Sequence, residues 1–472
     1  MIPVVPPEEM AALDRSAPEP AEVLIGRAGA AVAARAVELM GGAFRRRVVV
    51  VAGRGNNGAD GRVAAELLAA RGADVVVRAA GELGAGEELG AADLVVDAAY
   101  GTGLRRAYLP PSVSCRTLAV DIPSGLDGLT GEVPPDGGAL SAVATVTFAA
   151  LKPGLLLGRG PELAGEVTLA GIGLDGLASR AATCWALEDA DVARLLPGRP
   201  REAHKWQSAV QVVAGSPGMT GAPWLVSRAA MRSGAGYVRL SMPGVLPGAL
   251  PPGELVHLPV PASGWHAPVL AGLGRFRALV VGPGLGALAG GEQAGGEQAG
   301  GEQAGGEVAR LLLGAGVPAV VDADGLNAFG SLDNLASVVA RRSAPTVVTP
   351  HLGELSRLLG RTPGPDRLGE ARRAAARSGA VVLFKGSTTV VAAPDGRALI
   401  ATTGGPRLAT AGTGDVLAGM IGAFMARGAP AFEAAGLAAH VHGRAAAGGF
   451  AEGLVAGDLP DLVARWLSGV PR

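Results

Sequence analysis

The sequence predicts an α/β protein with two tandem domains, each built on a mainly parallel sheet. Its 472 residues exceed what a single core usually organises. β-branched apolar segments alternate with Ala- and Leu-rich helical segments, first in the N-terminal part of the chain and again after the stretch Leu195–Lys205. Hydrophobic residues make up 49% of the chain, which is enough for two buried cores.

The first series of strands begins at Arg47–Gly53, and a helix is expected over Asp60–Gly72, closed by a glycine. Further strands are expected in DVVV, DLVVDA, TLAVDI and ATVTFAA. This alternation predicts helices on both faces of a parallel sheet. We place the first domain at residues 1–174 and a linker at residues 175–204.

The second domain is expected at residues 205–472, where the alternation starts again. Its expected strands lie in SAVQVVAGS, YVRLSMP, RALVVGPG, PAVVDADG, PTVVTPH and AVVLFKG. Residues 290–307 are a tandem repeat of the unit AGGEQ. The high glycine content of this repeat predicts a flexible surface loop that the fold tolerates as an insertion.

Charge and composition exclude several classes of partner. The 41 basic and 42 acidic side chains give a net charge of −1, so we expect no nucleic-acid partner. We also expect no membrane partner, because there is no polybasic run, no secretory signal and no uninterrupted apolar stretch of about 18 residues. The two cysteines fit a cytoplasmic location. Helices rich in small residues permit close subunit packing, and a homo-oligomer is expected.

Four polar loops follow strands of the first domain. They are GRGNNGADG (Gly53–Gly61), DAAYGTGLRR (Asp97–Arg106), DIPSGLDG (Asp121–Gly128) and TFAALKPGL (Thr147–Leu155). Singly, each acid could cap a helix or shape a turn. The carboxyl ends of strands in an open α/β sheet converge on one crevice, however, so these loops are expected to meet there.

These loops resemble the signature loops of the NAD(P)H-hydrate epimerase family, and the resemblance covers residues 1–174. It implies a Rossmann-like three-layer αβα domain that interconverts the R and S epimers of hydrated NADH and NADPH. The implied contacts with the hydrate are Asn56, Asn57, Gly58, Ala59, Asp60, Gly101, Thr102, Gly103, Leu104, Arg105, Arg106, Ala107 and Asp121.

The resemblance also implies a potassium ion held by Asn57, Asp97 and Ser124, whose hard oxygen donors suit such a cation. Asp121 is our candidate for the catalytic acid/base, because a carboxylate can move the proton that epimerisation requires. Arg105 or Arg106 would neutralise phosphates of the substrate. One departure from the family pattern is Ala59, where the family has glycine. Alanine would cost about 1 kcal/mol or more there if the position required positive φ.

The segment ATAGTGDVLAGMIGAFMARG (Ala409–Gly428) is the strongest motif of the chain. A Gly-Thr-Gly turn opens a long apolar helix, so the N–H groups of Gly412–Gly414 can form an anion hole. Asp415 lies beside this hole, where it can take a proton from a hydroxyl that attacks a phosphate. The alternative is that Asp415 only caps the helix.

TPHLGE, FKGSTT and GTGD, in this order, resemble the NAD(P)H-hydrate dehydratase branch of the ribokinase-like superfamily over residues 205–465. The resemblance implies a ribokinase-like αβα domain. The implied contacts with the hydrate are Ala222, Gly284, Gly286, His351 and Asp415. The implied contacts with an adenine nucleotide are Lys385, Gly386, Ser387, Thr388, Thr389 and Gly414.

The implied reaction restores NADH or NADPH from the S hydrate. Asp415 would activate the C6 hydroxyl, ADP would phosphorylate it to give AMP, and phosphate would then leave. ATP is the alternative donor, and Mg²⁺ is expected to accompany the phosphates. The motif KWQSA (Lys205–Ala209) departs from the KGxxG pattern of the family.

Two other functions are compatible with the motifs. GTGD also occurs in small-molecule kinases of the same superfamily, of the hydroxymethylpyrimidine or thiazole type, which would form a stable phosphorylated product. A nucleotide-binding protein with one degenerate domain would bind without turnover, and Ala59 and KWQSA keep that interpretation open. The loops of the first domain favour hydrate repair over both.

Overall fold

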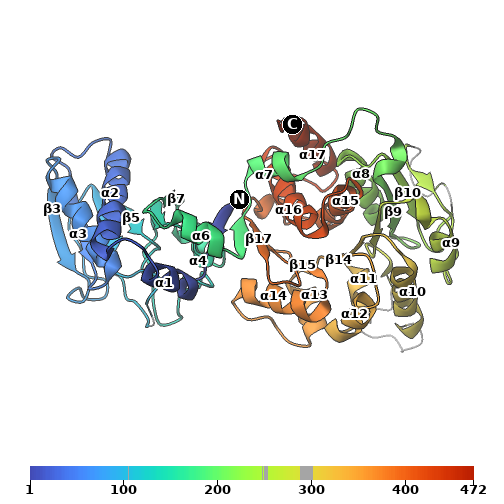
Figure 1. The fold of residues 1–472 in the computed structure, drawn as a ribbon, viewed down its shortest axis with the longest axis horizontal. Helices are drawn as coiled ribbons and strands as arrows, with labels where there is room; N and C mark the ends of the chain where they lie inside the picture. Colours follow the sequence, from blue (N-terminus) through green and yellow to red (C-terminus); the bar gives the residue numbers. More distant parts are fainter. Residues whose placement is uncertain (105, 247, 249–252, 287–300, 472) are drawn as a thin grey trace. The chain divides into compact units, whose positions relative to one another are not determined.

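The computed structural model describes residues 1–104, 106–246, 248, 253–286 and 301–471. The described chain forms two compact units (Figure 1). The first unit is Ile2–Trp185, and the second begins at Ala186 and includes Met1.

The first unit is built on a six-stranded sheet in the order β3-β2-β4-β5-β6-β7. All neighbouring strands in it are parallel, as the alternation of strands and helices predicted. The strands are β2 (Arg47–Ala52), β3 (Asp74–Ala79), β4 (Leu94–Ala98), β5 (Arg116–Val120), β6 (Ala144–Phe148) and β7 (Glu166–Ala170). We had not expected β7, whose short sequence EVTLA lies at the edge of the sheet.

The helices α2 (Ala21–Met40) and α3 (Asn56–Ala69) pack together and cover one face of this sheet. Their approach depends on small residues, because a Cβ on Gly29 would lie 2.5 Å from a methyl of Val63. The other face packs mainly against connecting segments, where Val49 and Val95 meet residues such as Tyr108. The shorter elements of the unit are β1 (Ile2–Val4), α1 (Pro7–Arg15), α4 (Pro153–Leu156), α5 (Gly160–Leu163) and α6 (Asp175–Ala181).

The helix that we expected to begin at Asp60 begins at Asn56, so most of the motif GRGNNGADG is helical. Its glycines allow close packing. A Cβ on Gly58 would lie 2.0 Å from the carbonyl oxygen of Gly53, and one on Gly61 would lie 2.4 Å from the Cβ of Ala98. Ala59 lies within this helix and does not have positive φ, so the strain that we considered for it is absent.

Most of the expected linker, residues 175–204, is folded. It contains α6, β8 (Cys184–Ala186) and α7 (Asp189–Leu195), and its longest segment without helix or strand is residues 196–204. Ala178 and Ala182 are buried in the core of the first unit, which explains why this stretch is ordered. A capping box between Glu188 and Asp191 begins α7. The two units divide between Trp185 and Ala186, within the stretch that we had assigned to the linker.

The sheet of the second unit contains the neighbouring strands β17-β16-β15-β14-β13-β12-β9-β10-β11. Pairing is parallel from β14 to β11 and between β14 and β15, whereas β15, β16 and β17 pair antiparallel. The strands are β9 (Ala209–Val213), β10 (Tyr237–Ser241), β11 (Val256–His257), β12 (Ala278–Val281), β13 (Ala319–Val321), β14 (Thr346–Val348), β15 (Val381–Phe384), β16 (Thr389–Ala392) and β17 (Ala398–Ala401). Every strand expected in this half of the chain is present.

Helices cover both faces of this sheet. In Figure 1, α15 and α16 lie on one side of it and α12, α13 and α14 on the other. α15 is buried along almost its whole length, as its apolar sequence predicts. The helices are α8 (Gly221–Arg232), α9 (His266–Ala271), α10 (Gly301–Gly314), α11 (Asp324–Asn327), α12 (Leu332–Val339), α13 (Leu352–Leu359), α14 (Arg367–Ser378), α15 (Thr413–Ala426), α16 (Ala431–Ala447) and α17 (Leu459–Ser468).

The last part of the AGGEQ repeat is helical, although we expected a loop over residues 290–307. Residues 290–300 lie outside the described chain, and α10 begins at Gly301. Glu307, the last residue of the repeat, is buried and accepts hydrogen bonds from the backbone N–H groups of Gly264 and His266. It also contacts the His266 ring at 2.7 Å. These hydrogen bonds fix the end of the repeat to the fold.

In the part of the chain that the structure describes, no helix is long and apolar enough to cross a membrane.

Candidate functional sites

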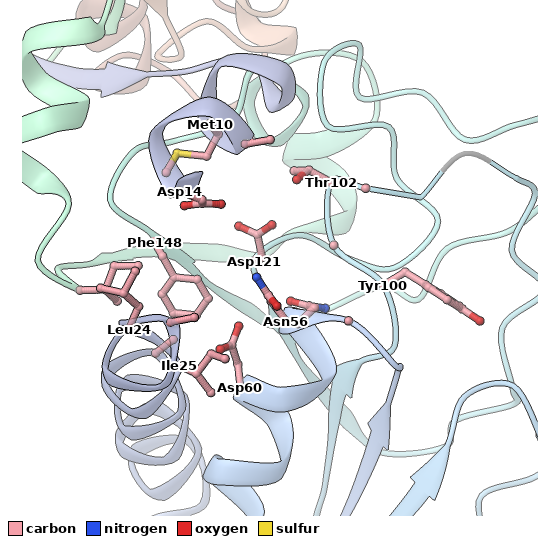
Figure 2. Close-up of a pocket in the computed structure, with 18 of the residues that line it drawn as sticks. Met10, Asp14, Leu24, Ile25, Asn56, Asp60, Tyr100, Thr102, Asp121 and Phe148 are labelled. Carbon is pink, nitrogen blue, oxygen red and sulfur yellow. The ribbon is translucent and has the colours of Figure 1, made fainter. Parts of the chain in front are cut away.

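A cavity of about 870 Å³ opens in the first unit at the carboxyl ends of the strands (Figure 2). Its walls come from α1, α2, the first turn of α3 and the loops after β4, β5 and β6. Three carboxylates, Asp14, Asp60 and Asp121, face this space from three different elements. The strand-end loops thus meet in one place, as the parallel topology requires.

Asp121 and Lys152 form the central ion pair of this cavity. The Nζ atom of Lys152 lies 2.7 Å from Oδ1 of Asp121 and donates to Thr147 Oγ1 at 2.9 Å and to the Phe148 carbonyl at 3.1 Å. Thr147 in turn donates to Asp121 at 3.2 Å. Lys152 is only 2% exposed, so its charge depends on these partners. Asp121 has a φ of 68°, an uncommon conformation that directs its carboxylate from the end of β5.

Asp60 differs from Asp121 in its surroundings. Its side chain is buried, and burial, reinforced by the negative charges of Asp121 and Asp14, raises its pKa to about 8. The positive charge of Lys152 opposes this shift but is the smallest contribution. Asp14 lies nearer the mouth of the cavity, and the loss of surrounding solvent there also raises its pKa. At neutral pH, Asp60 therefore carries a proton while Asp121 is paired with a cation.

The residues proposed for potassium lie beside this cavity. Asp97 is fully buried, accepts from the Ser124 hydroxyl at 2.7 Å and from the Ser124 backbone N–H at 2.8 Å, and has a pKa raised by burial. The Ser124 hydroxyl also accepts from the backbone N–H of Tyr100. The side-chain amide of Asn57 is buried, and neither its oxygen nor its nitrogen has a hydrogen-bond partner. A buried amide oxygen without a partner is the feature expected of a cation ligand.

The structure places many of the predicted hydrate contacts in this cavity. Those that line it are Asn56, Asn57, Asp60, Gly101, Thr102, Gly103, Leu104, Arg106 and Asp121. Gly58, Ala59 and Ala107 are not among the lining residues, and Gly58 packs against the backbone of Gly53 instead. Arg105 lies outside the described residues. Arg106 donates to the Tyr100 hydroxyl at 3.1 Å.

The second unit has a separate polar site at the N-terminus of α15. The Nζ atom of Lys385 lies 2.9 Å from Asp322 Oδ1 and 3.6 Å from Glu354 Oε2. A Cβ on Gly414 would lie 3.6 Å from the same Nζ atom, so the first turn of α15 adjoins this ion pair. Residues that follow β13, β14 and β15 thus meet the helix terminus whose free N–H groups can bind an anion.

Asp415 lies in this first turn and has a pKa raised to about 7. Burial is the largest cause, the negative charge of Asp322 follows, and Asp324 adds a smaller contribution; Lys385 opposes the shift. A carboxylate with a pKa near neutrality is suited to accepting a proton from a hydroxyl. The N-cap residue of α15 is Gly412, which provides no side-chain capping hydrogen bond.

The glycine loop after β12 adjoins the same site. Gly286 donates its backbone N–H to Asp324 Oδ2 at 2.9 Å, and a Cβ on Gly284 would lie 3.1 Å from the Cβ of Ala222. Both glycines have positive φ, which leaves room for a ligand close to the backbone. Ala323, between Asp322 and Asp324, has a φ of 51°. Asp322 contacts Lys385, whereas Asp324 accepts the hydrogen bond from Gly286.

His351 lies at the start of α13. Its Nδ1 atom accepts from the backbone N–H groups of Gly353 and Glu354, while Glu354 accepts from the N–H of His351 in return. The imidazole is 54% exposed, and its Nε2 atom lies 3.6 Å from Glu354 Oε1. The loop Lys385–Thr389 is held by Arg367, which donates to the carbonyl of Lys385 at 3.1 Å and stacks on the Phe384 ring.

Sequence reasoning missed several charged residues of these sites. They are Asp14 and Lys152 in the first unit and Asp322 and Asp324 in the second. All except Asp14 lie in or next to the expected strand ends, in TFAALKPGL and PAVVDADG. Their place at a strand end was the signal that could have identified them. Asp14 lies on α1, and only the tertiary fold brings it to the cavity.

In the part of the chain that the structure describes, no group of three or more His, Cys, Asp or Glu side chains is arranged to hold a metal ion. The candidate cation ligands of the first unit accordingly combine one carboxylate with an amide and a hydroxyl.

Comparison with known proteins matches both units. A family model described as NAD(P)H-hydrate dehydratase matches residues 210–468. A second model, described as YjeF-related protein N-terminus, matches residues 21–88 and 82–154. The two matches therefore lie within the second and the first unit, respectively.

Curated relatives match over nearly the whole chain. The bifunctional NAD(P)H-hydrate repair enzyme Nnr of Salinibacter ruber is 37% identical, with 98% of this chain and 96% of the relative covered. The protein of the same name from Moorella thermoacetica is 36% identical over 96% of this chain and 94% of its own length. Among solved structures, a ribokinase-like superfamily protein from Enterococcus faecalis covers 61% of this chain and 96% of its own, with a TM-score of 0.50 and 21% identity, which shows the fold of the second unit.

Proposed function

The chain belongs to the family of bifunctional NAD(P)H-hydrate repair enzymes, and on that premise we propose that each of its two units carries one activity. The first unit interconverts the R and S epimers of hydrated NADH and NADPH. The second dehydrates the S epimer at the expense of ADP, giving AMP and phosphate. The observation that carries this proposal is that each unit has its own polar site. The cavity of the first unit holds the Asp121–Lys152 ion pair, and in the second unit Lys385 adjoins the first turn of α15, which contains Asp415.

In the second unit, the substrate hydroxyl would lie beside Asp415, which takes its proton as the oxygen attacks the terminal phosphorus of the nucleotide. The phosphate group is received by the N–H groups of Gly412–Gly414 and by Lys385. Phosphate then leaves C6, and the loss of a proton from C5 restores the dihydronicotinamide. Ala222, Gly284, Gly286 and His351 would hold the hydrate, while Lys385–Thr389 and Gly414 would hold the nucleotide.

Two cations are part of this proposal. Mg²⁺ is expected to accompany the nucleotide, because that ion is usually bound through substrate phosphates together with one or two carboxylates. It would neutralise charge on the transferred phosphate. The buried amide of Asn57, which has no partner, fits a potassium ion shared with Asp97 and Ser124. That ion would order the loops that hold the hydrate.

In the first unit, Asp121 is the catalytic acid/base at C6, and Lys152 positions it. The lining residues Asn56, Asn57, Asp60, Gly101–Leu104 and Arg106 would hold the hydrate. The first turn of α3 and Arg106 can receive its phosphates.

We also propose that the protein is cytoplasmic and homo-oligomeric, and light scattering of the purified chain gives its mass in solution.

The test is recovery of reduced-nicotinamide absorbance from mixed R and S NADH hydrate with Mg²⁺, K⁺ and either ADP or ATP. We expect the S fraction to be recovered first and the R fraction to follow, faster with ADP. A stable phosphorylated product without recovery would identify a small-molecule kinase instead. Nucleotide binding without any turnover would support a degenerate domain.

A further inference from the structure

The chemistry of epimerisation requires two proton-transferring groups in the cavity of the first unit. The hydroxyl of the hydrate is on C6, a carbon bonded to the ring nitrogen. When an acid protonates this hydroxyl, the C–O bond breaks, water leaves and the nitrogen lone pair forms a C=N bond. Water then adds from the other face as a base takes its proton. One water leaves and one enters, and the proton given by the first group is recovered by the second.

Asp121 is suited to only one of these roles at a time. Its ion pair with Lys152 at 2.7 Å and its hydrogen bond from Thr147 make it the carboxylate that accepts a proton. The complementary role needs a carboxylic acid that faces the same space without a cation of its own.

Asp60 meets this description. It lines the cavity from the first turn of α3, whereas Asp121 reaches the cavity from the end of β5 (Figure 2). Its side chain is 7% exposed, and within the described residues its carboxyl group forms no hydrogen bond or ion pair that would hold it in a structural role. A buried polar group of this kind is costly unless a ligand engages it.

Charges from every neighbouring element define the protonation of Asp60. Asp121 and Asp14 raise its pKa, in addition to burial, and Lys152 lowers it. The other charged side chains that line the cavity are Arg15 and Glu19, near the mouth, and Arg106. Two carboxyl groups in one cavity with different surroundings, one paired with a lysine and one buried without a cation, are the arrangement that divides acid and base roles in other enzymes.

We propose that Asp60 is the second catalytic residue of this cavity and acts on the face of the nicotinamide ring opposite to the face served by Asp121. This inference rests on the proposed epimerase activity. In one direction Asp60 protonates the leaving hydroxyl and Asp121 takes the proton of the incoming water. The reverse direction exchanges the two roles, and the open cavity allows both groups to equilibrate with solvent between turnovers.

The test uses the full chain without nucleotide, so that the second unit is idle, and follows conversion of purified R NADH hydrate to the S form by chiral chromatography across pH. For the wild type we expect activity to fall as pH rises through about 8, because Asp60 then loses its proton. Asp60→Asn should lower kcat by about 100-fold or more with little change in KM, since one proton-transferring group is lost. In this variant the fall of activity as pH rises through about 8 should also disappear.

Asp60→Glu, which keeps a carboxyl group, should retain part of the activity and a fall of activity at shifted pH. Asp74→Asn, at an exposed aspartate on β3 of the same unit, is the matched control and should behave as the wild type. An Asp60→Asn protein with near wild-type kcat and an unchanged fall of activity with pH would overturn the proposal. If Asp60→Asn does not fold, an unshifted fall of activity in Asp60→Glu overturns it equally. Absence of interconversion in the wild type would instead contradict the proposed epimerase function.

Discussion

Lys152 shows how one residue determines the charge balance of the first site. It is almost fully buried, and its three acceptors are a carboxylate, a hydroxyl and a backbone carbonyl. A buried cation is tolerated only with such partners, and a carboxylate left without its cation is equally costly. Lys152 therefore affects both the stability of the unit and the state of Asp121.

Replacing Lys152 with methionine should lower the stability of the first unit by about 3 kcal/mol, because Asp121 loses its charged partner. Epimerisation should be lost, while dehydration of the S hydrate should continue. Urea unfolding and the two separate assays measure these effects. The double variant Asp121→Asn/Lys152→Met should regain part of the lost stability, since no unpaired charge remains. Equal stability of Lys152→Met and the wild type would show that the ion pair is not structural.

Asp322 is the residue that sets the proton affinity of Asp415 after burial itself. It raises the pKa of Asp415 by its negative charge and also holds Lys385 at 2.9 Å. Asp415 must be ionised to accept a proton, so the dehydration rate of the wild type should fall as pH drops through about 7.

In Asp322→Asn this fall should move to lower pH, because a like charge is removed and Lys385 becomes free to attract Asp415. Asp324→Asn is the control. It removes a smaller contribution to the raised pKa of Asp415, so its pH dependence should move less than that of Asp322→Asn. The pH dependence of kcat on S NADH hydrate, with the nucleotide saturating, measures both. A fall of activity that stays near pH 7 in Asp322→Asn would mean that Asp322 does not contribute to the raised pKa of Asp415.

At the scale of elements, α3 converts a glycine-rich motif into the wall of a binding site. The helix begins four residues earlier than the apolar pattern indicated, because Gly58 and Gly61 permit contact with β2, β4 and the loop after β2. The motif thus brings Asn56, Asn57 and Asp60 into one helical turn that lines the cavity. Ala59 occupies an ordinary helical position there.

Ala59→Gly should therefore lower the stability of the first unit by up to about 1 kcal/mol, because glycine is the poorer helix former. A stabilising effect would show that the position prefers positive φ after all. Gly58→Ala, one residue earlier, should cost about 3 kcal/mol, since its new Cβ would clash with the carbonyl of Gly53. Thermal unfolding of both variants distinguishes the two positions.

At the scale of the whole molecule, each unit has its own sheet, core and polar site. The two activities should therefore be separable by single substitutions. Asp121→Asn should abolish interconversion of the epimers and leave dehydration of purified S hydrate intact, whereas Asp415→Asn should do the reverse. Separate assays with R and S NADH hydrate measure this. Loss of both activities in either variant would contradict independent sites.

The sequence by itself determined the class of fold, the positions of most strands and the loops that carry chemistry, because strand-helix periodicity and strand-end motifs are local signals. Asp97, Asp121, Ser124 and Asp415 all belong to such motifs, so their positions in the loops follow from the order of residues alone. The sequence did not locate β7, the start of α3 or the folded character of residues 175–195, whose stability depends on packing against distant segments.

Only the tertiary structure decided which side chains share a site and in what protonation state. Asp14 reaches the cavity because α1 folds over it, and Lys152 pairs with Asp121 because β5 and β6 are neighbours in the sheet. The raised pKa values of Asp60 and Asp415 arise from burial and from charges on other elements. Burial and proximity are properties of the packed chain, and a pattern along the sequence does not contain them.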